Sequence, residues 1–370
     1  MSFVATDRIA PRPPPSTAFG PWVRVRRDYF GSALAGSTTL ALAALAAWAA
    51  WNFLAWAVAS AVFSTHGAGP DACRAPGAGA CWAVAVDKMR LIIFGIYPRD
   101  QQWRPSAAML VLLSMFVATT RQRAWNRWLA LAWAVAVGVI GVLMWGGVAG
   151  LTRVPDDQWG GLPVTLILAT LGLAAGFPLA ILLALARHSR KPTVAKAVSV
   201  AFIEVTRSVP LLVVLFLASV MIPLFLPAGM DLSKLFRVFV AFALFIAAYL
   251  AEVIRGGLLA IPKGQYDAAA ALGLGTWVTT TRVILPQVLA MVLPALVNVF
   301  IAFFKATSIV VVVGIFDLMT AAKRAVADPQ WQGFGTEIYL VVGAIYFVFC
   351  HAMSRYSARL RRTMHPVHRG

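Results

Sequence analysis

The chain has 370 residues, of which 60% are hydrophobic and only 12% are charged, and its formal net charge is +18. Soluble domains contain about 45–50% apolar and about 25% charged residues, so this composition excludes an ordinary soluble fold and indicates an integral membrane protein. The positive charge does not indicate nucleic-acid binding, because the basic residues form short clusters between apolar runs, as in cytoplasmic loops of membrane proteins. The sequence has neither a metal-ligand spacing nor a G-x-x-x-x-G-K-[S/T] phosphate-binding loop.

The N-terminal part predicts one membrane span followed by an outside loop. Residues 1–32 are basic and proline-rich, and we expect a disordered cytoplasmic segment with an interfacial end. The apolar run 33–63 is too long for a signal-peptide core and is predicted to be the first span. The loop 64–105 contains Cys73 and Cys81, which either form a disulfide or remain two free thiols.

Seven further apolar runs approach or exceed the roughly 20 residues that a spanning helix needs. They are 106–120, which is short, 128–148, 162–186, 196–225, 237–254, 288–315 and 337–354. We therefore predict an all-α membrane protein with about eight transmembrane helices. Residues 33–160 are expected to form an accessory unit, 161–355 the main membrane domain, and 356–370 a basic tail.

The distribution of lysine and arginine predicts the orientation. Segments expected inside hold 20 of these residues, and segments expected outside hold 10. Positive residues prefer the cytoplasmic side of a membrane, so both termini and the segment 262–286 are predicted to be cytoplasmic.

The segment 262–286 is rich in small residues and stands between two apolar runs. Pro262 suits the first position of a helix, and Asp267 is expected near the start of that helix, where the helix dipole favours a negative charge. Ala268 and Ala269 favour helix formation and add little bulk. The glycines Gly273 and Gly275 are expected to stop this helix in a turn with positive φ.

A second short helix is predicted after this turn. Thr276 can cap it, and the helix is expected to run to Leu285 and to end at Pro286. The pattern thus predicts two short helices at an angle, with a surface that a partner protein can approach closely.

Ionisable residues within spans are functional candidates by default. Glu204 and Arg207 are three residues apart, as are Glu252 and Arg255, so each pair shares one helix face. One hypothesis is that each pair neutralises itself. The other is that Glu204 or Arg207 faces a translocation path, where a guanidinium would bind a carboxylate through two hydrogen bonds.

Further polar residues are candidates for the same path. Pro210 is expected to interrupt its helix and to free backbone groups that can line a cavity. Lys305 lies in the middle of the seventh apolar run and either lines the path, pairs with Glu204, or extends to one membrane face. Three residues near it complete the candidate path: Asn298, Thr307 and Ser308.

The motif D-A-A-x-x-x-G that starts at Asp267, followed by V-I-L-P at 283–286, resembles the E-A-A loop of ABC importer permeases. Asp267 stands where that family usually has Glu, which shortens the reach of the carboxylate by one methylene. The stretches 202–216, 255–266 and 298–310 look like the polar amino acid uptake branch, and the resemblance covers roughly 160–360. The stretch 92–105 is similar to the general L-amino-acid permeases of Gram-negative bacteria.

The resemblance implies a type I permease core in spans four to eight, within an importer of L-amino acids of broad specificity. It implies that Asp267, Ala268, Ala269, Gly273, Leu285 and Pro286 belong to coupling helices that dock on an ABC ATPase subunit. Further implied partners are a periplasmic amino-acid-binding protein and a second, related permease in a heterodimer, in the bacterial inner membrane. This chain would carry no cofactor, since ATP and Mg²⁺ would bind the ATPase.

Two other classes are alternatives. An ion- or proton-coupled secondary transporter would use Glu204, Arg207 and Lys305 equally well, but it would not explain the segment 262–286. A membrane-embedded enzyme would need a catalytic cluster, and the sequence shows neither a Ser/His/Asp set nor paired carboxylates near an interface.

Overall fold

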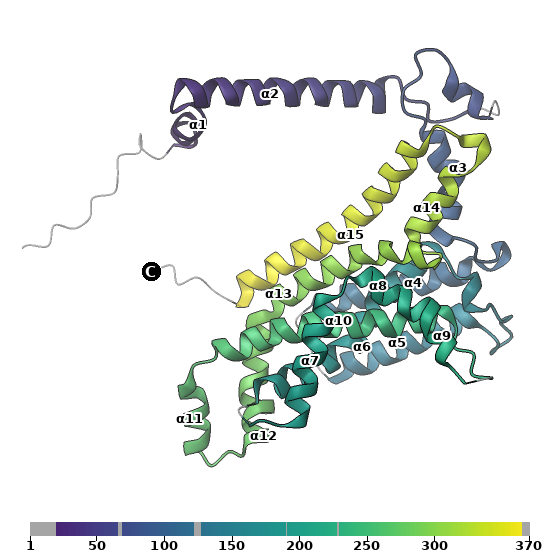
Figure 1. The fold of residues 1–370 in the computed structure, drawn as a ribbon. Coiled ribbons are helices and arrows are strands. Elements are labelled where there is room, and N and C mark those ends of the chain that lie inside the picture. The colour runs from purple at the N-terminus through teal and green to yellow at the C-terminus, as the bar shows by residue number, and fades with distance from the viewer. Residues whose placement is uncertain (1–19, 66–68, 122–126, 190, 228, 365–370) are drawn as a thin grey trace, which may run out of the picture. The chain divides into compact units, whose positions relative to one another are not determined.

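The computed structural model describes residues 20–65, 69–121, 127–189, 191–227 and 229–364 (Figure 1). Residues 1–19 of the predicted disordered segment, Arg123 in the predicted inside loop, and residues 365–370 of the basic tail lie outside this range. The described residues contain helices and only two isolated β-bridges, which confirms the all-α prediction for them. The chain divides into two compact units, 1–83 and 84–370.

The first unit contains one long apolar helix. Its elements are α1 (Pro21–Phe30), α2 (Ala33–Leu54), the π-helical turn η2 (Ala55–Ala59) and the 3₁₀ helix η3 (Gly69–Arg74). Ser32 is the N-cap of α2, and its hydroxyl accepts a hydrogen bond of 3.1 Å from the Ala35 amide. Together α2 and η2 give an apolar run over Ala33–Ala59, long enough to cross a membrane, within the predicted 33–63.

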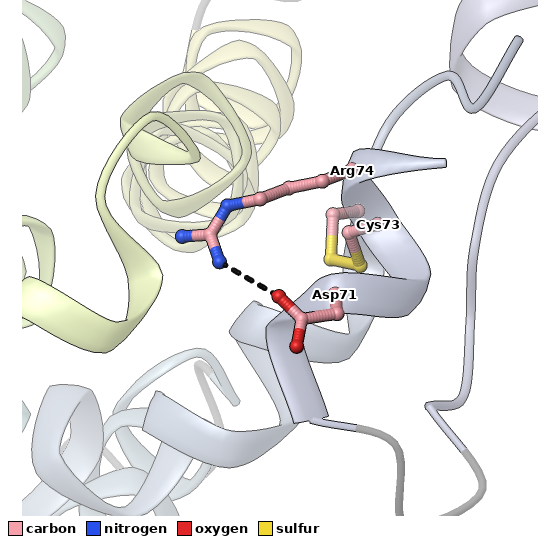
Figure 2. The surroundings of a disulfide bond; sticks show 4 residues. Asp71, Cys73 and Arg74 are labelled. Atoms are coloured by element: carbon pink, nitrogen blue, oxygen red, sulfur yellow. Dashed lines mark hydrogen bonds and ion pairs between the residues drawn. A yellow bond between two sulfur atoms is a disulfide. The ribbon is translucent and has the colours of Figure 1, made fainter. Parts of the chain in front are cut away.

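Cys73 and Cys81 form a disulfide in the first unit, with their Cα atoms 5.5 Å apart (Figure 2). Both cysteines are buried. Beside them, Arg74 forms an ion pair of 3.2 Å with Asp71. Cys81 also forms an isolated bridge with Val62, so the loop is attached to the chain that follows α2.

The second unit is a bundle of long helices with shorter ones at its ends (Figure 1). Its elements after α3 (Trp82–Phe94), which begins at the boundary, are η4 (Arg99–Gln101), α4 (Trp103–Thr119), α5 (Arg127–Trp145), η6 (Asp156–Gln158), α6 (Gly161–His188), α7 (Val194–Ser208), α8 (Leu211–Phe216), η7 (Leu217–Met221), α9 (Ile222–Phe225), α10 (Lys234–Ala260), α11 (Lys263–Ala271), α12 (Thr276–Val278), η8 (Thr279–Ile284), α13 (Leu285–Ala306), η9 (Thr307–Val313), α14 (Leu318–Val326), η10 (Pro329–Trp331) and α15 (Gly335–Met364).

The described residues contain six helices that are long and apolar enough to span a membrane, and one bent pair that is a seventh candidate. The 17-residue helix α4 corresponds to the short predicted span 106–120, so about eight spans agree with the prediction. The predicted span 196–225 is not one straight helix. Its two parts, Val194–Ser208 and Leu211–Phe225, meet at an angle of 103°. Pro210 lies at this break, because proline cannot donate the backbone hydrogen bond that a continuous helix requires there.

Helices α6 and α10 form the centre of the second unit. Phe242, Ile246 and Leu250 are completely buried and follow one face of α10 at intervals of four residues. Gly172 and Gly176 of α6 permit close approach to this face, since a Cβ atom at Gly176 would lie 2.7 Å from the carbonyl oxygen of Ala243. Small residues at contacts are how membrane helices gain dense packing without a hydrophobic driving force between them.

One fully buried arginine joins α4 to the end of α5. The Arg104 side chain is 1% exposed and donates hydrogen bonds to the carbonyl oxygens of Leu143 at 2.7 Å and Thr152 at 2.9 Å, and to the Gln101 side chain. The carbonyl of Leu143 lies in the last turn of α5, where helix carbonyls lack intrahelical partners and the dipole favours a cation. The stretch 92–105 is therefore a structural joint between α3, α4 and α5.

A second polar contact joins α3 to the connection between α14 and α15. The Lys88 ammonium lies 2.6 Å from a carboxylate oxygen of Asp328 and 2.9 Å from one of Asp87. The hydrogen bond from Lys88 holds the pKa of Asp328 below its usual value, so this carboxylate is ionised at neutral pH.

We expect Arg104→Gln to destabilise the protein by about 3 kcal/mol, because buried carbonyl oxygens at the end of α5 would lose their donors. Thermal unfolding of the purified protein in detergent would measure this loss. Arg99→Gln is the matched control, since Arg99 belongs to the same stretch and is exposed. Equal melting temperatures for the two variants would contradict the role assigned to Arg104.

Candidate transport site and coupling segment

The segment 262–286 begins with a short helix, as predicted, but this helix starts one residue later than expected. Pro262 is the N-cap of α11 and not its first residue, and it has the extended backbone typical of a cap. Asp267 is the fifth residue of α11, so the first turn contains no acidic residue. The expected interaction of Asp267 with the helix N-terminus is therefore wrong. Asp267 and Ala268 are exposed, whereas Ala269 is buried where α11 packs against η8.

The turn after α11 uses one glycine with positive φ. Gly273 has φ of +71°, a conformation in which a side chain would be strained. Gly275 has φ of −67° and is the N-cap of α12, so Thr276 does not cap this helix as predicted. The Thr276 carbonyl oxygen instead accepts a hydrogen bond of 2.8 Å from the Thr280 hydroxyl.

The second helix of the segment does not end at Pro286. It continues through the π-helical turn η8 into α13, and Thr276–Val313 forms one helical run of 38 residues. Leu285 and Pro286 are the first residues of α13. The prediction failed for two reasons. The wider π-helical turn before Pro286 accommodates a residue that has no backbone N–H. A proline in the first turn of a helix loses no intrahelical hydrogen bond, so it does not break α13.

The tip of this segment exposes large apolar side chains. Leu272 is 78% exposed and Trp277 is 73% exposed, on either side of the turn at Gly273. Figure 1 shows α11 and α12 at one end of the second unit and α14 at the opposite end. Exposed apolar residues that are grouped at a projecting turn are typical of a protein-binding surface.

Five charged residues form a cluster where α6, α7 and α10 meet; we call it the ion cluster, and it consists of Arg187, Glu204, Arg207, Glu252 and Arg255. Glu252 is its centre and accepts hydrogen bonds from Arg255. The Arg187 guanidinium lies 2.7 Å from Glu204 and 3.4 Å from Glu252. Arg207 lies 3.8 Å from Glu252.

The ion cluster bears on the hypothesis that each pair neutralises itself. Glu252 and Arg255 pair with each other along α10, as one hypothesis stated. Glu204 and Arg207 do not form an ion pair with each other, and each finds its partner on another helix. Self-neutralisation of Glu204 and Arg207 is thus wrong, because Arg187 at the end of α6 and Glu252 on α10 lie closer to them.

A cavity of about 480 Å³, which we call the arginine cavity, lies beside the break between α7 and α8. Arg207 and Pro210 line it on one side, and the aromatic rings of Phe245, Tyr249 and Phe303 line it from α10 and α13. The Arg207 guanidinium carbon lies 5.6 Å from the centre of the Tyr249 ring, within the range of a cation–π interaction. This arrangement can bind a carboxylate near Arg207 and an apolar group near the rings.

The other predicted path residues do not line the arginine cavity. The face of α13 that does so contains Val299, Ala302 and Ala306, and the predicted Asn298 and Lys305 lie beside it and are exposed. Among the described residues no ion pair joins Lys305 to Glu204.

The two hydroxyl residues that follow Lys305 bond to nearby carbonyl oxygens. Thr307 is buried and donates a hydrogen bond of 2.8 Å to the Phe304 carbonyl. Ser308 donates one of 2.8 Å to the Lys305 carbonyl. Both hydroxyls thus satisfy backbone oxygens of their own helical turns, where η9 replaces α13.

A larger cavity of about 560 Å³ lies between α6, α10 and α13, but its lining is entirely apolar, with Phe177, Leu293 and Phe300 among its residues. It offers no polar group that could orient a charged solute, so the arginine cavity is the better candidate for a transport site.

Arg187 and the three aromatic residues were missed from the sequence. Arg187 was expected only as one of the positive residues of the inside loops, although it lies in the last turn of α6 and forms ion pairs with two glutamates. The spacing of Phe245 and Tyr249 places both rings on one face of a helix, and this spacing could have indicated an aromatic lining.

Together, these features define a multi-span helical membrane protein with a cavity lined by an arginine and aromatic rings, and with an exposed apolar tip. A model of the family described as "binding-protein-dependent transport system inner membrane component" matches residues 176–366. The chain belongs to this family. It is a transport component and not an enzyme, and a secondary transporter that works alone is the less supported alternative.

Two relatives match nearly the whole chain. The inner membrane amino-acid ABC transporter permease protein YhdY of Escherichia coli (strain K12) is 42% identical over 357 residues, which are 95% of each chain. The glutamate/glutamine/aspartate/asparagine transport system permease protein BztC of Rhodobacter capsulatus is 34% identical and matches 100% of this chain and 99% of its own. A crystal structure of an amino acid ABC transporter is 34% identical over 55% of this chain and 92% of its own, with a TM-score of 0.49.

We expect Ala269→Leu to loosen α11 from η8, because added methylenes at a buried position cost about 1–3 kcal/mol. Hydrogen–deuterium exchange of residues 263–272 would increase in this variant. Ala270→Leu is the control, since Ala270 is the neighbouring residue and is exposed. The same exchange in both variants would contradict the packing described for α11.

Proposed function

We propose that this chain is a membrane-spanning permease subunit of an ATP-driven importer that moves L-amino acids across the bacterial inner membrane. The observation that carries the proposal is the exposed apolar tip at Leu272 and Trp277, which would dock on an ABC ATPase subunit. Asp267 and Ala268 are exposed on α11 beside this tip and would contribute to the same contact. ATP and Mg²⁺ would bind the ATPase and not this chain, which lacks a phosphate-binding loop.

The orientation proposed for the chain places α11, α12 and both termini in the cytoplasm. The bias of lysine and arginine supports this orientation. It places α14 and the α3 contact with Asp328 on the periplasmic side, where an amino-acid-binding protein would deliver substrate. The family description, which names a dependence on a binding protein, supports this partner.

A second permease subunit is part of the proposal. Lys305 and Asn298 are exposed on α13 within the apolar run Thr276–Val313, and a lysine that faces lipid inside a span costs at least about 2.5 kcal/mol. A neighbouring protein surface would remove this cost. We propose a related but different permease at this face, so that the complex is a heterodimer within the membrane.

In the proposed mechanism the arginine cavity is part of the translocation path. Arg207 would bind the α-carboxylate that all amino acids share, and the aromatic rings would contact side chains with little selectivity, which favours broad specificity. ATP binding would draw the ATPase subunits together and move α11, and this movement would change the access to the cavity from one side of the membrane to the other.

We expect the chain, purified from its native membrane, to bring an ATP-hydrolysing subunit with it, and L-amino acids to stimulate ATP hydrolysis in the presence of the binding protein. Mass spectrometry of the purified complex and an ATPase assay with individual amino acids would test this. A chain that purifies without an ATPase, and that still transports when ATP is depleted, would favour the secondary transporter.

We expect Arg207→Gln to reduce uptake by about tenfold or more in proteoliposomes, since a charge-assisted bidentate contact is worth about 1.5–3 kcal/mol. Arg207→Lys is expected to recover only part of the uptake, because an ammonium cannot form two parallel hydrogen bonds with a carboxylate. Arg121→Gln, at the exposed end of α4, serves as a control. Normal uptake by both Arg207 variants, in complexes that assemble correctly, would rule out this site.

A further inference from the structure

The contacts of Arg207 connect the arginine cavity to α10. The Arg207 guanidinium approaches two residues of this helix, the ring of Tyr249 at 5.6 Å and the carboxylate of Glu252 at 3.8 Å. Tyr249 and Glu252 are three residues apart and therefore lie on one helix face. Because both contacts belong to α10, a displacement of α10 changes the position of the guanidinium in the cavity.

Helix α10 also leads directly to the segment 262–286. It ends at Ala260, and Pro262 then begins α11. Eight residues separate Glu252 from Ala260, which corresponds to about 12 Å along a helix. Near this end Gly257 allows α10 to approach α13, since a Cβ atom there would lie 2.5 Å from Val292. Tightly packed helices transmit strain, so we expect α10 to move as one element when α11 is displaced.

The other charges of the ion cluster allow Glu252 to lose its contact with Arg207 and still have an ion-pair partner. Glu252 also faces Arg255, with which it forms hydrogen bonds, and Arg187 at 3.4 Å. The cluster holds three arginines and two glutamates, so Glu252 keeps a partner when Arg207 turns away. Loss of an only partner would leave a half-buried carboxylate without a counter-charge, and this arrangement avoids that loss.

We infer that Glu252 is a positioning residue that serves as the counter-ion of Arg207 in the absence of substrate and links Arg207 to α11. The carboxylate of an incoming amino acid replaces Glu252 at the guanidinium. This exchange frees α10 from Arg207 and lets α11 respond to the ATPase. Without substrate, the contact restrains the transporter and limits futile ATP hydrolysis. This inference rests on the proposed function.

The test is the ATPase activity of the assembled transporter in proteoliposomes, with and without the binding protein loaded with an amino acid. We expect Glu252→Gln to raise the activity without substrate, so that the ratio of stimulated to basal activity falls about fivefold or more. Asp28→Asn removes an exposed carboxylate from α1 and is expected to leave the ratio unchanged.

A double-mutant cycle with Arg207→Gln separates a positioning role from a merely structural one. If Glu252 acts through Arg207, Arg207→Gln also raises the activity without substrate, and Glu252→Gln adds no further rise in that background. A wild-type ratio in Glu252→Gln, or the same rise of the substrate-free activity in both backgrounds, would overturn the inference. If Glu252→Gln does not assemble, Glu252→Asp keeps the charge but shortens its reach, and the ratio is again expected to fall. An unchanged ratio in Glu252→Asp would then count against the inference.

Failure of the proposed function gives a different result. In that case Arg207→Gln transports normally, or no amino acid stimulates ATP hydrolysis in the wild type. In contrast, the inference about Glu252 fails on its own when Arg207→Gln loses transport and Glu252→Gln behaves as the wild type.

Discussion

The carboxylate of Glu252 holds together one end of the helix bundle. It attracts arginines from α6, α7 and α10, and each of these helices places its charge near the end of an apolar run. Charges in such surroundings are stable only when they are paired, so the three helices are tied to one another at this point. The bend after α7 and the arginine cavity lie next to this ion cluster, and α10 leads from the cluster to α11.

Three departures from regular helix geometry in the second unit lie beside the arginine cavity or within the segment 262–286. In a membrane every backbone polar group needs an internal partner, so broken helices persist only beside cavities or protein surfaces. The break at Pro210 lies beside the arginine cavity. The positive φ of Gly273 allows α11 to turn back toward α12. The π-helical turn η8 is continuous with the long span α13 and supports α11 through their packing.

The predicted elements agreed best where length and hydropathy alone decide the outcome. The spans near 162–186 and 237–254 correspond to α6 and α10, and the short run 106–120 corresponds to α4. The site was harder to predict. Arg207 and Pro210 do line a cavity, but Lys305 and Asn298 face outward on α13, beside the face that contributes Val299 and Ala302. Helical spacing groups residues on a face, but it does not say which neighbour that face contacts.

The sequence by itself determined that the protein is helical and membrane-spanning, which runs are long enough to cross a bilayer, and where the D-A-A motif of residues 262–286 lies. These properties follow from local hydrophobicity and from the charge of the connecting loops, and both can be read directly from the sequence. Only the tertiary structure decided that Glu204 pairs with Arg187, that Arg207 turns to Glu252, and that the helix continues past Pro286. Charges find their partners by distance in space, and residues far apart in the sequence become neighbours only when the helices pack.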